Sequence, residues 1–177
     1  WDKEKILADV VWAIRKTRPD VIINRFPTTG EGGHGHHTAS AILSVEAFDA
    51  AADPLRFPEQ LQWVQPWQAR RLFLNSFIPR NSTTPPPDMS GQIKLDVGTY
   101  NPLEGASYGE IAASSRSMHK SQGFGVPATR GPIIENFKKL KGDTAVSDIF
   151  ENIDFTWKRL QSKETISASV ETILSSF

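Results

Sequence analysis

The chain has 177 residues, and its 20 basic and 20 acidic residues cancel to a formal net charge of zero at pH 7. Without an excess of positive charge, nucleic acid and anionic membranes are disfavoured as partners. The absence of cysteine excludes disulfide bonds and thiolate metal ligands, and it leaves the cellular compartment open.

The length suits one core, and we predict a single domain over residues 1–177. No apolar run approaches the roughly 18 to 20 residues of a membrane span, so we expect none. The N-terminus also lacks the layout of a signal peptide. The chain starts at Trp1 without a methionine and stops at Phe177 within an amphipathic pattern. We therefore expect it to be a piece of a longer protein.

The N-terminal part predicts a helix followed by a buried strand. Apolar residues recur at helical spacing between residues 2 and 17, which is typical of a helix that packs on a core. Pro19 and Asp20 end this helix, and the β-branched run from Val21 to Ile23 predicts a strand buried on both faces. A helix, a tight loop and a buried strand form an α/β unit.

Helices and strands continue to alternate along the rest of the chain. We predict a helix from about His34 to Asp53, strands at 69–75 and 92–98, a helix over 106–122, a β-like stretch near 130–140 and one or two helices after it. The stretch from about 76 to 91 contains three consecutive prolines and predicts an extended loop within the domain. The predicted fold class is therefore α/β.

One short stretch, TTGEGGHGHHTAS, holds three of the four histidines, His34, His36 and His37. It follows the first strand and opens the next helix, and open α/β sheets bind ligands at the carboxyl ends of their strands. His34 and His37 share a helical face, so their imidazoles can converge on a zinc ion or on a substrate atom beside it. The alternative is a solvated helix turn in which the neighbouring glycines serve the turn alone.

Here the sequence resembles a known family. The stretch RPDVIINRFPTTGEGGHGHHTAS looks like the second signature region of the LmbE-like, or PIG-L, family of zinc-dependent N-acetylglucosaminyl deacetylases, in which a buried strand leads to an H-P-D-H motif. The later SRSMHKSQGFG is similar to the family's third region, where a helix ends in a His-x-Ser-Gln pattern. The resemblance covers roughly residues 2–125. It implies a Rossmann-like three-layer sandwich that is incomplete at its N-terminus.

The resemblance implies roles for individual residues. His37 matches the last histidine of H-P-D-H, which the family uses as a zinc ligand. His34 matches the first histidine, which helps to stabilise the oxyanion of the tetrahedral intermediate. His119 and Gln122 match the third region and would line the substrate site, although His119 could equally cap a helix end.

Two departures from the family pattern accompany these matches. Gly35 and His36 stand where the family has Pro-Asp, so an imidazole replaces the carboxylate that would orient His34. His36 still offers a hydrogen bond there and stays a catalytic candidate. The family's A-H-P-D-D-E motif, which supplies two zinc ligands and the general base, occurs nowhere in the sequence. We expect it in an upstream segment, so that the chain alone binds zinc weakly and is inactive.

Other side chains have both a functional and a structural interpretation. Arg25 follows the first strand and could clamp a substrate carboxylate or phosphate, or else form a structural ion pair. Glu31 is either a partner of a histidine or a solvated loop acid. Four aromatic residues near the second strand could stack on sugars or pack in the core: Trp63, Trp67, Phe73 and Phe77.

The function implied by the resemblance is that of a metal-dependent hydrolase with Zn²⁺ as its cofactor. It would remove the acetyl group from an N-acetylglucosamine-type or related amide, so its partners would be an amino-sugar or glycoconjugate substrate and the upstream segment. Zinc-activated water would attack the acetyl carbonyl while an upstream Asp takes the proton. The alternatives are a non-catalytic glycan-binding module that retains the deacetylase fold, and a histidine-based metal buffer.

Overall fold

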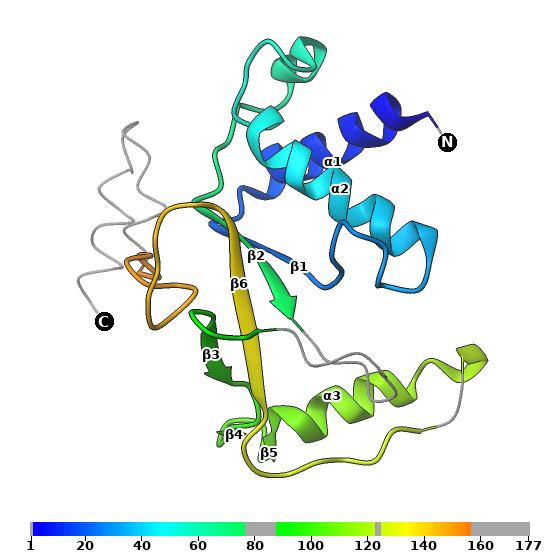
Figure 1. The fold of residues 1–177 in the computed structure, drawn as a ribbon, viewed down its shortest axis with the longest axis vertical. Helices are drawn as coiled ribbons and strands as arrows, with labels where there is room; N and C mark the ends of the chain where they lie inside the picture. The colour runs from blue at the N-terminus through cyan, green and yellow to red at the C-terminus, as the bar shows by residue number, and fades with distance from the viewer. Residues whose placement is uncertain (1, 77–87, 123–124, 157–177) are drawn as a thin grey trace, which may run out of the picture.

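The computed structural model describes residues 2–76, 88–122 and 125–156. Within these ranges the chain forms three α-helices, a four-stranded mixed sheet and a two-stranded sheet (Figure 1), which confirms the predicted α/β class. None of the helices in these ranges is long and apolar enough to cross a membrane. Most of the predicted proline-rich loop and the stretch after residue 156 lie outside the described residues.

Helix α1 (Lys3–Thr17) confirms the first predicted helix. The Asp2 carboxylate caps its N-terminus by accepting a hydrogen bond from the backbone N–H of Lys5. Leu7 and Val11 lie fully buried on its apolar stripe. The periodicity of the sequence therefore identified the face that packs on the core.

Helix α2 (Gly35–Ala50) packs against α1, and Ala47 is fully buried between them. The buried guanidinium of Arg15, on α1, donates to carbonyl groups at the C-terminal end of α2 and in the segment that follows it. Its acceptors are the backbone oxygens of Ala50, Ala51, Asp53, Arg56 and Phe57 and the side-chain oxygen of Gln60. The Arg15 guanidinium thus supplies hydrogen-bond donors to carbonyl groups at the C-terminal end of α2 from inside the protein.

The main sheet has the strand order β1-β2-β6-β3 and consists of β1 (Val21–Asn24), β2 (Arg71–Ser76), β6 (Ile134–Gly142) and β3 (Ile93–Asp96). β1 and β2 are parallel, and β6 runs antiparallel to both β2 and β3. β1, β2 and β3 therefore point the same way. Their carboxyl ends meet at the end of the sheet where β6 begins.

The two faces of this sheet are covered differently. Ile22 and Leu72 point toward the face covered by α1 and α2. Phe73 and Phe137 lie on the opposite face and pack with Ile149 from the segment after β6. Among the described residues, helices thus cover only one face, and a second helical layer of the expected three-layer sandwich is not seen there.

β1 differs from its prediction as a strand buried on both faces. Within the described part of the chain it pairs with β2 alone, which makes it an edge strand. Ile23 is consequently 45% exposed. A run of β-branched residues indicates a strand, but it does not say how many neighbours that strand has.

The region after β3 forms the hairpin β4 (Tyr100–Asn101) and β5 (Ala106–Ser107), followed by α3 (Tyr108–Ser117). Figure 1 places α3 beyond the end of the sheet at which β6 begins. The hairpin was not predicted, and α3 ends before His119, which was predicted to lie on it. Two 3-10 helices complete the described elements: η1 (Pro58–Gln62) and η2 (Lys120–Gln122).

Candidate functional site

The three clustered histidines lie between the carboxyl end of β1 and the first turn of α2. His34 is the N-cap residue of α2, and His36 and His37 follow in its first turn. The loop that carries them turns at Gly30 and Gly33, whose φ angles of 99° and 79° are rarely adopted by residues with a side chain. The sequence pattern of strand, glycine-rich loop and helix therefore located these residues correctly.

His37 is held in one orientation by two contacts. Its Nδ1 lies 2.8 Å from the carbonyl oxygen of Gly32, which assigns the ring proton to Nδ1. Its ring stacks on Phe26, with centroids 3.7 Å apart and planes 3° from parallel. A Cβ at Gly32 would lie 3.0 Å from Phe26 Cδ1 and 3.1 Å from His37 Cβ, so glycine permits this packing. A histidine ligand commonly donates one ring N–H to a carbonyl group and binds its metal ion through the other nitrogen, which in His37 is Nε2.

His34 lies against His37. The two ring centroids are 5.0 Å apart and the ring planes are almost perpendicular, at 88°. The His34 side chain makes no capping hydrogen bond to α2, and the residue is exposed. The structure thus brings together the two imidazoles that the resemblance assigns to metal binding and to the oxyanion.

A cavity of about 560 Å³ opens beside β1, and His36 and Arg25 both line it. Ile22 of β1 and Leu43 of α2 contribute apolar wall, and Asn24 adds a polar group. Sites for small molecules usually combine apolar walls with a few polar groups in this way. Two more of the predicted site residues are therefore placed around one cavity.

Asn24 is a residue of this site that the sequence analysis missed. It ends β1, it is buried, and its Oδ1 accepts a hydrogen bond of 2.6 Å from the hydroxyl of Ser44 on α2. This bond ties the middle of α2 to the end of β1 and so helps to fix the position of the helix that carries the histidines. A polar residue directly after a β-branched run was the available signal.

Two charged candidates have protein partners. Arg25 Nη1 donates to the side-chain oxygen of Asn75 and lies 3.4 Å from a carboxylate oxygen of Glu135, which also accepts from Asn75 Nδ2 at 2.7 Å. This network favours the structural interpretation of Arg25, although the residue also lines the cavity. Glu31 accepts a hydrogen bond from the hydroxyl of Thr29, which lowers the pKa of Glu31 and fits a loop acid.

The residues of the third region follow α3, whereas the clustered histidines lie at the start of α2. His119 is exposed just after α3, and its backbone N–H donates to the Arg116 carbonyl at 3.2 Å, at the end of the helix. Gln122 belongs to η2.

The aromatic residues near β2 divide between core and surface. Phe73 is fully buried in β2, and Trp67 packs against the α1–α2 core while its Nε1 donates to the Pro19 carbonyl at 2.8 Å. Both are accounted for by packing. Trp63 is exposed and free to stack on a ligand, and Phe77 lies outside the described residues.

The histidines of the site could supply part of the ligand set of a zinc ion. A catalytic zinc takes three protein ligands, whereas the described residues contain no group of three or more His, Asp or Glu side chains arranged to hold a metal. His37 offers an oriented Nε2, and His34 is the neighbouring imidazole. Further ligands would have to come from outside the described residues.

No protein-family model matches the chain, and no curated protein matches it. The function must therefore be inferred from the residues of the site.

Proposed function

We propose that the chain forms part of a zinc-dependent N-deacetylase that hydrolyses the acetyl amide of an N-acetylglucosamine-type or related substrate. The observation that carries this proposal is the oriented His37, with its Nδ1 bound to Gly32 and its ring beside His34. The pair lies at the carboxyl end of β1, where open α/β sheets bind ligands. A solvated helix turn would not need to anchor an imidazole on both an aromatic face and a carbonyl group.

The residues of this chain would have separate roles in the reaction. His37 would bind zinc through Nε2, and zinc, when bound, supplies a Lewis acid that lowers the pKa of water to about 7. His34 would donate a hydrogen bond to the oxyanion that develops on the attacked carbonyl. The cavity lined by His36 and Arg25 would receive the part of the substrate next to the amide.

The remaining zinc ligands and the general base are proposed to come from an upstream segment with an A-H-P-D-D-E motif. The edge strand β1 has an unpaired side within the described sheet. A further parallel strand at this edge would deliver its carboxyl end next to His37, because parallel strands end at the same side of a sheet. The complete domain would then be a Rossmann-like three-layer sandwich of the LmbE-like type.

A second candidate function is a non-catalytic glycan-binding module with the same fold. The identity of His36 favours it, because an imidazole stands where the resemblance calls for the carboxylate that orients His34. In such a module the cavity beside β1 would hold a sugar without hydrolysing it.

The test compares His37→Ala with the matched control Thr38→Ala, in the protein that carries the proposed upstream segment. We expect about one zinc per chain and acetate release from an N-acetylglucosamine substrate in the wild type and in Thr38→Ala, and loss of both in His37→Ala. Unchanged zinc content and acetate release in His37→Ala would overturn the ligand assignment. Sugar binding without acetate release in the wild type would favour the binding module.

A further inference from the structure

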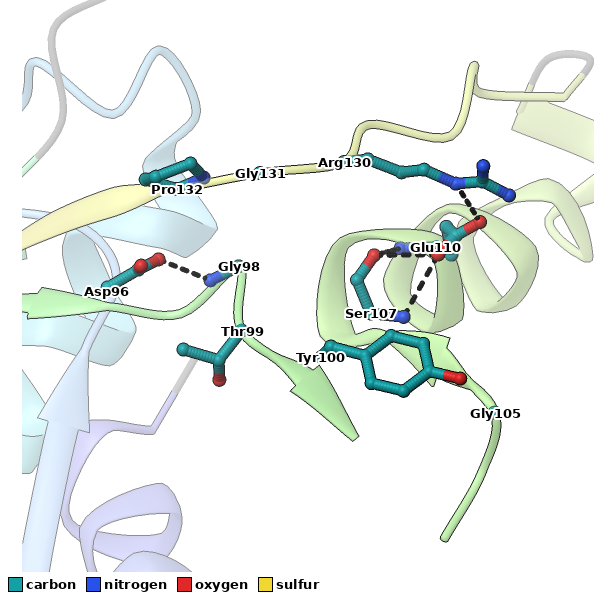
Figure 2. A pocket seen from close by; sticks show the side chains of 10 residues that line it. All are labelled: Asp96, Gly98, Thr99, Tyr100, Gly105, Ser107, Glu110, Arg130, Gly131 and Pro132. Atoms are coloured by element: carbon teal, nitrogen blue, oxygen red, sulfur yellow. Dashed lines mark hydrogen bonds and ion pairs between the residues drawn. The ribbon is translucent and has the colours of Figure 1, made fainter. Parts of the chain in front are cut away.

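A second cavity, of about 620 Å³, lies at the same end of the sheet as the histidines but follows β3 instead of β1 (Figure 2). Three segments form it: the turn after β3, the start of α3 and the residues before β6. The strand order places three strand spacings, roughly 14 Å, between β1 and β3. Both cavities therefore open at the carboxyl ends of strands in one sheet.

The walls of this second cavity are held by close backbone contacts. A Cβ at Gly98 would lie 2.2 Å from the carbonyl oxygen of Gly131, and a Cβ at Gly109 would lie 2.6 Å from that of Thr129. Asp96 also folds back to accept the backbone N–H of Gly98 at 2.8 Å. Only glycine fits at positions 98 and 109, so the backbones of the three segments pack closely against one another around the cavity.

The charges around the cavity disfavour an anionic ligand. Asp96 and Glu110 contribute two carboxylates against the single guanidinium of Arg130. Glu110 accepts the Ser107 backbone N–H at 3.0 Å and Arg130 Nε at 2.7 Å, and these bonds lower the pKa of Glu110 to about 2. Ser107 in turn caps α3. Neither a surplus of positive charge nor an uncapped helix N-terminus is left for a phosphate or a carboxylate.

The groups that remain for a ligand are an aromatic ring and hydrogen-bonding oxygens. Figure 2 shows the ring of Tyr100 on the side of α3, with Asp96 and Thr99 on the opposite side. Tyr100 is 62% exposed. Asp96 accepts the backbone N–H groups of Gly98 and Ile133 through Oδ1. Its Oδ2 and the Thr99 hydroxyl, both on exposed residues, form no hydrogen bond within the described residues. Apolar ring faces pack on aromatic side chains, and a carboxylate oxygen accepts hydrogen bonds from hydroxyl groups.

We propose that this cavity binds an uncharged sugar ring of an oligosaccharide, at a distance from the acetyl group that reacts at the histidines. The position of the reacting group rests on the proposed function, whereas the sugar site at Tyr100 and Thr99 does not. Because roughly 14 Å separates the two strands, a monosaccharide cannot occupy both cavities. The substrate class is thereby narrowed to saccharides of several units.

The test is a titration of the protein with the trimer of N-acetylglucosamine, followed by backbone amide NMR and by calorimetry. We expect the amide resonances of Gly98 and Tyr100 to shift, and Tyr100→Ala to weaken trimer binding by about tenfold or more, the equivalent of about 1.4 kcal/mol. Thr99→Val, which replaces the hydroxyl group by a methyl group of similar size, should also weaken trimer binding. Leu103→Ala is the matched control, because Leu103 is 94% exposed in the same hairpin and does not line the cavity.

Trimer binding that Tyr100→Ala and Thr99→Val both leave unchanged would overturn the proposal, as would shifts confined to other parts of the sheet. The zinc content of His37→Ala distinguishes failure of the sugar site from failure of the proposed deacetylase. If His37→Ala keeps its zinc, the ligand assignment fails while the sugar site is still judged by Tyr100→Ala. If His37→Ala loses its zinc, the trimer-induced shifts at Gly98 should persist.

Discussion

The two described regions on either side of residues 77–87 are stabilised in different ways. Residues 2–76 enclose an apolar core between α1, α2 and the sheet, in which Val11 and Ala47 are completely buried. In residues 88–122 and 125–156, Ala113 is the one buried side chain of α3, and hydrogen bonds at Ser107 and Ser117 hold the two ends of this helix. The histidines are thus carried by the well-packed region, whereas the second cavity is built from polar and backbone contacts.

The largest effect is expected inside the first region, from Arg15→Met. The substitution removes hydrogen bonds from a buried guanidinium to five backbone carbonyls and to Gln60 at once, so the free energy of unfolding should fall by about 3 kcal/mol. Denaturant unfolding measures this change. Lys16→Met is the matched control on the exposed face of α1, and it should change stability by less than about 0.5 kcal/mol. Equal losses in both variants would contradict the role assigned to Arg15.

An intermediate effect is expected in the second region, from Ser107→Ala. Ser107 caps α3 and exchanges hydrogen bonds with Glu110 in a capping box, so its loss should cost about 1 kcal/mol. Hydrogen exchange should speed up in α3 and leave α1 unchanged, because the two helices share no core cluster. Equal acceleration in α1 would show that the two regions unfold as one unit.

The smallest effect is a pH dependence confined to the second region. Hydrogen bonds from Ser107 and Arg130 lower the pKa of Glu110 from 4.5 to about 2. Glu110 therefore adds stability that is fully present above pH 4.5 and is lost as the pH falls toward about 2. The stability difference between the wild type and Glu110→Gln should shrink over that interval, while Glu104→Gln on the same hairpin serves as the control. A difference independent of pH would contradict this assignment.

Much of the fold follows from local patterns. The 3.6-residue periodicity before residue 17 and the β-branched run at Val21 to Ile23 predicted α1 and β1, because each pattern reports on its own segment. The edge position of β1 and the antiparallel insertion of β6 between β2 and β3 could not be predicted, because they depend on pairing between distant segments. The hairpin of β4 and β5 is too short to leave a periodic signal.

In the candidate site, too, local features were predictable from the sequence, whereas contacts that depend on folding were not. The glycine-rich stretch predicted where His34, His36 and His37 lie, since a loop between a strand and a helix is a local feature. The contacts that orient His37, from Phe26 and the Gly32 carbonyl, depend on how the loop folds back. They were not visible in the sequence.

The central claim is that His37 presents Nε2 to a metal ion, and ¹⁵N NMR of the histidine side chains tests it most directly. Spectra of the protein with the proposed upstream segment would be recorded before and after zinc is added. We expect His37 to carry its proton on Nδ1, bound to the Gly32 carbonyl, and zinc to shift the Nε2 resonance of His37. A His37 protonated on Nε2, or a Nε2 resonance that zinc leaves unchanged, would contradict this claim.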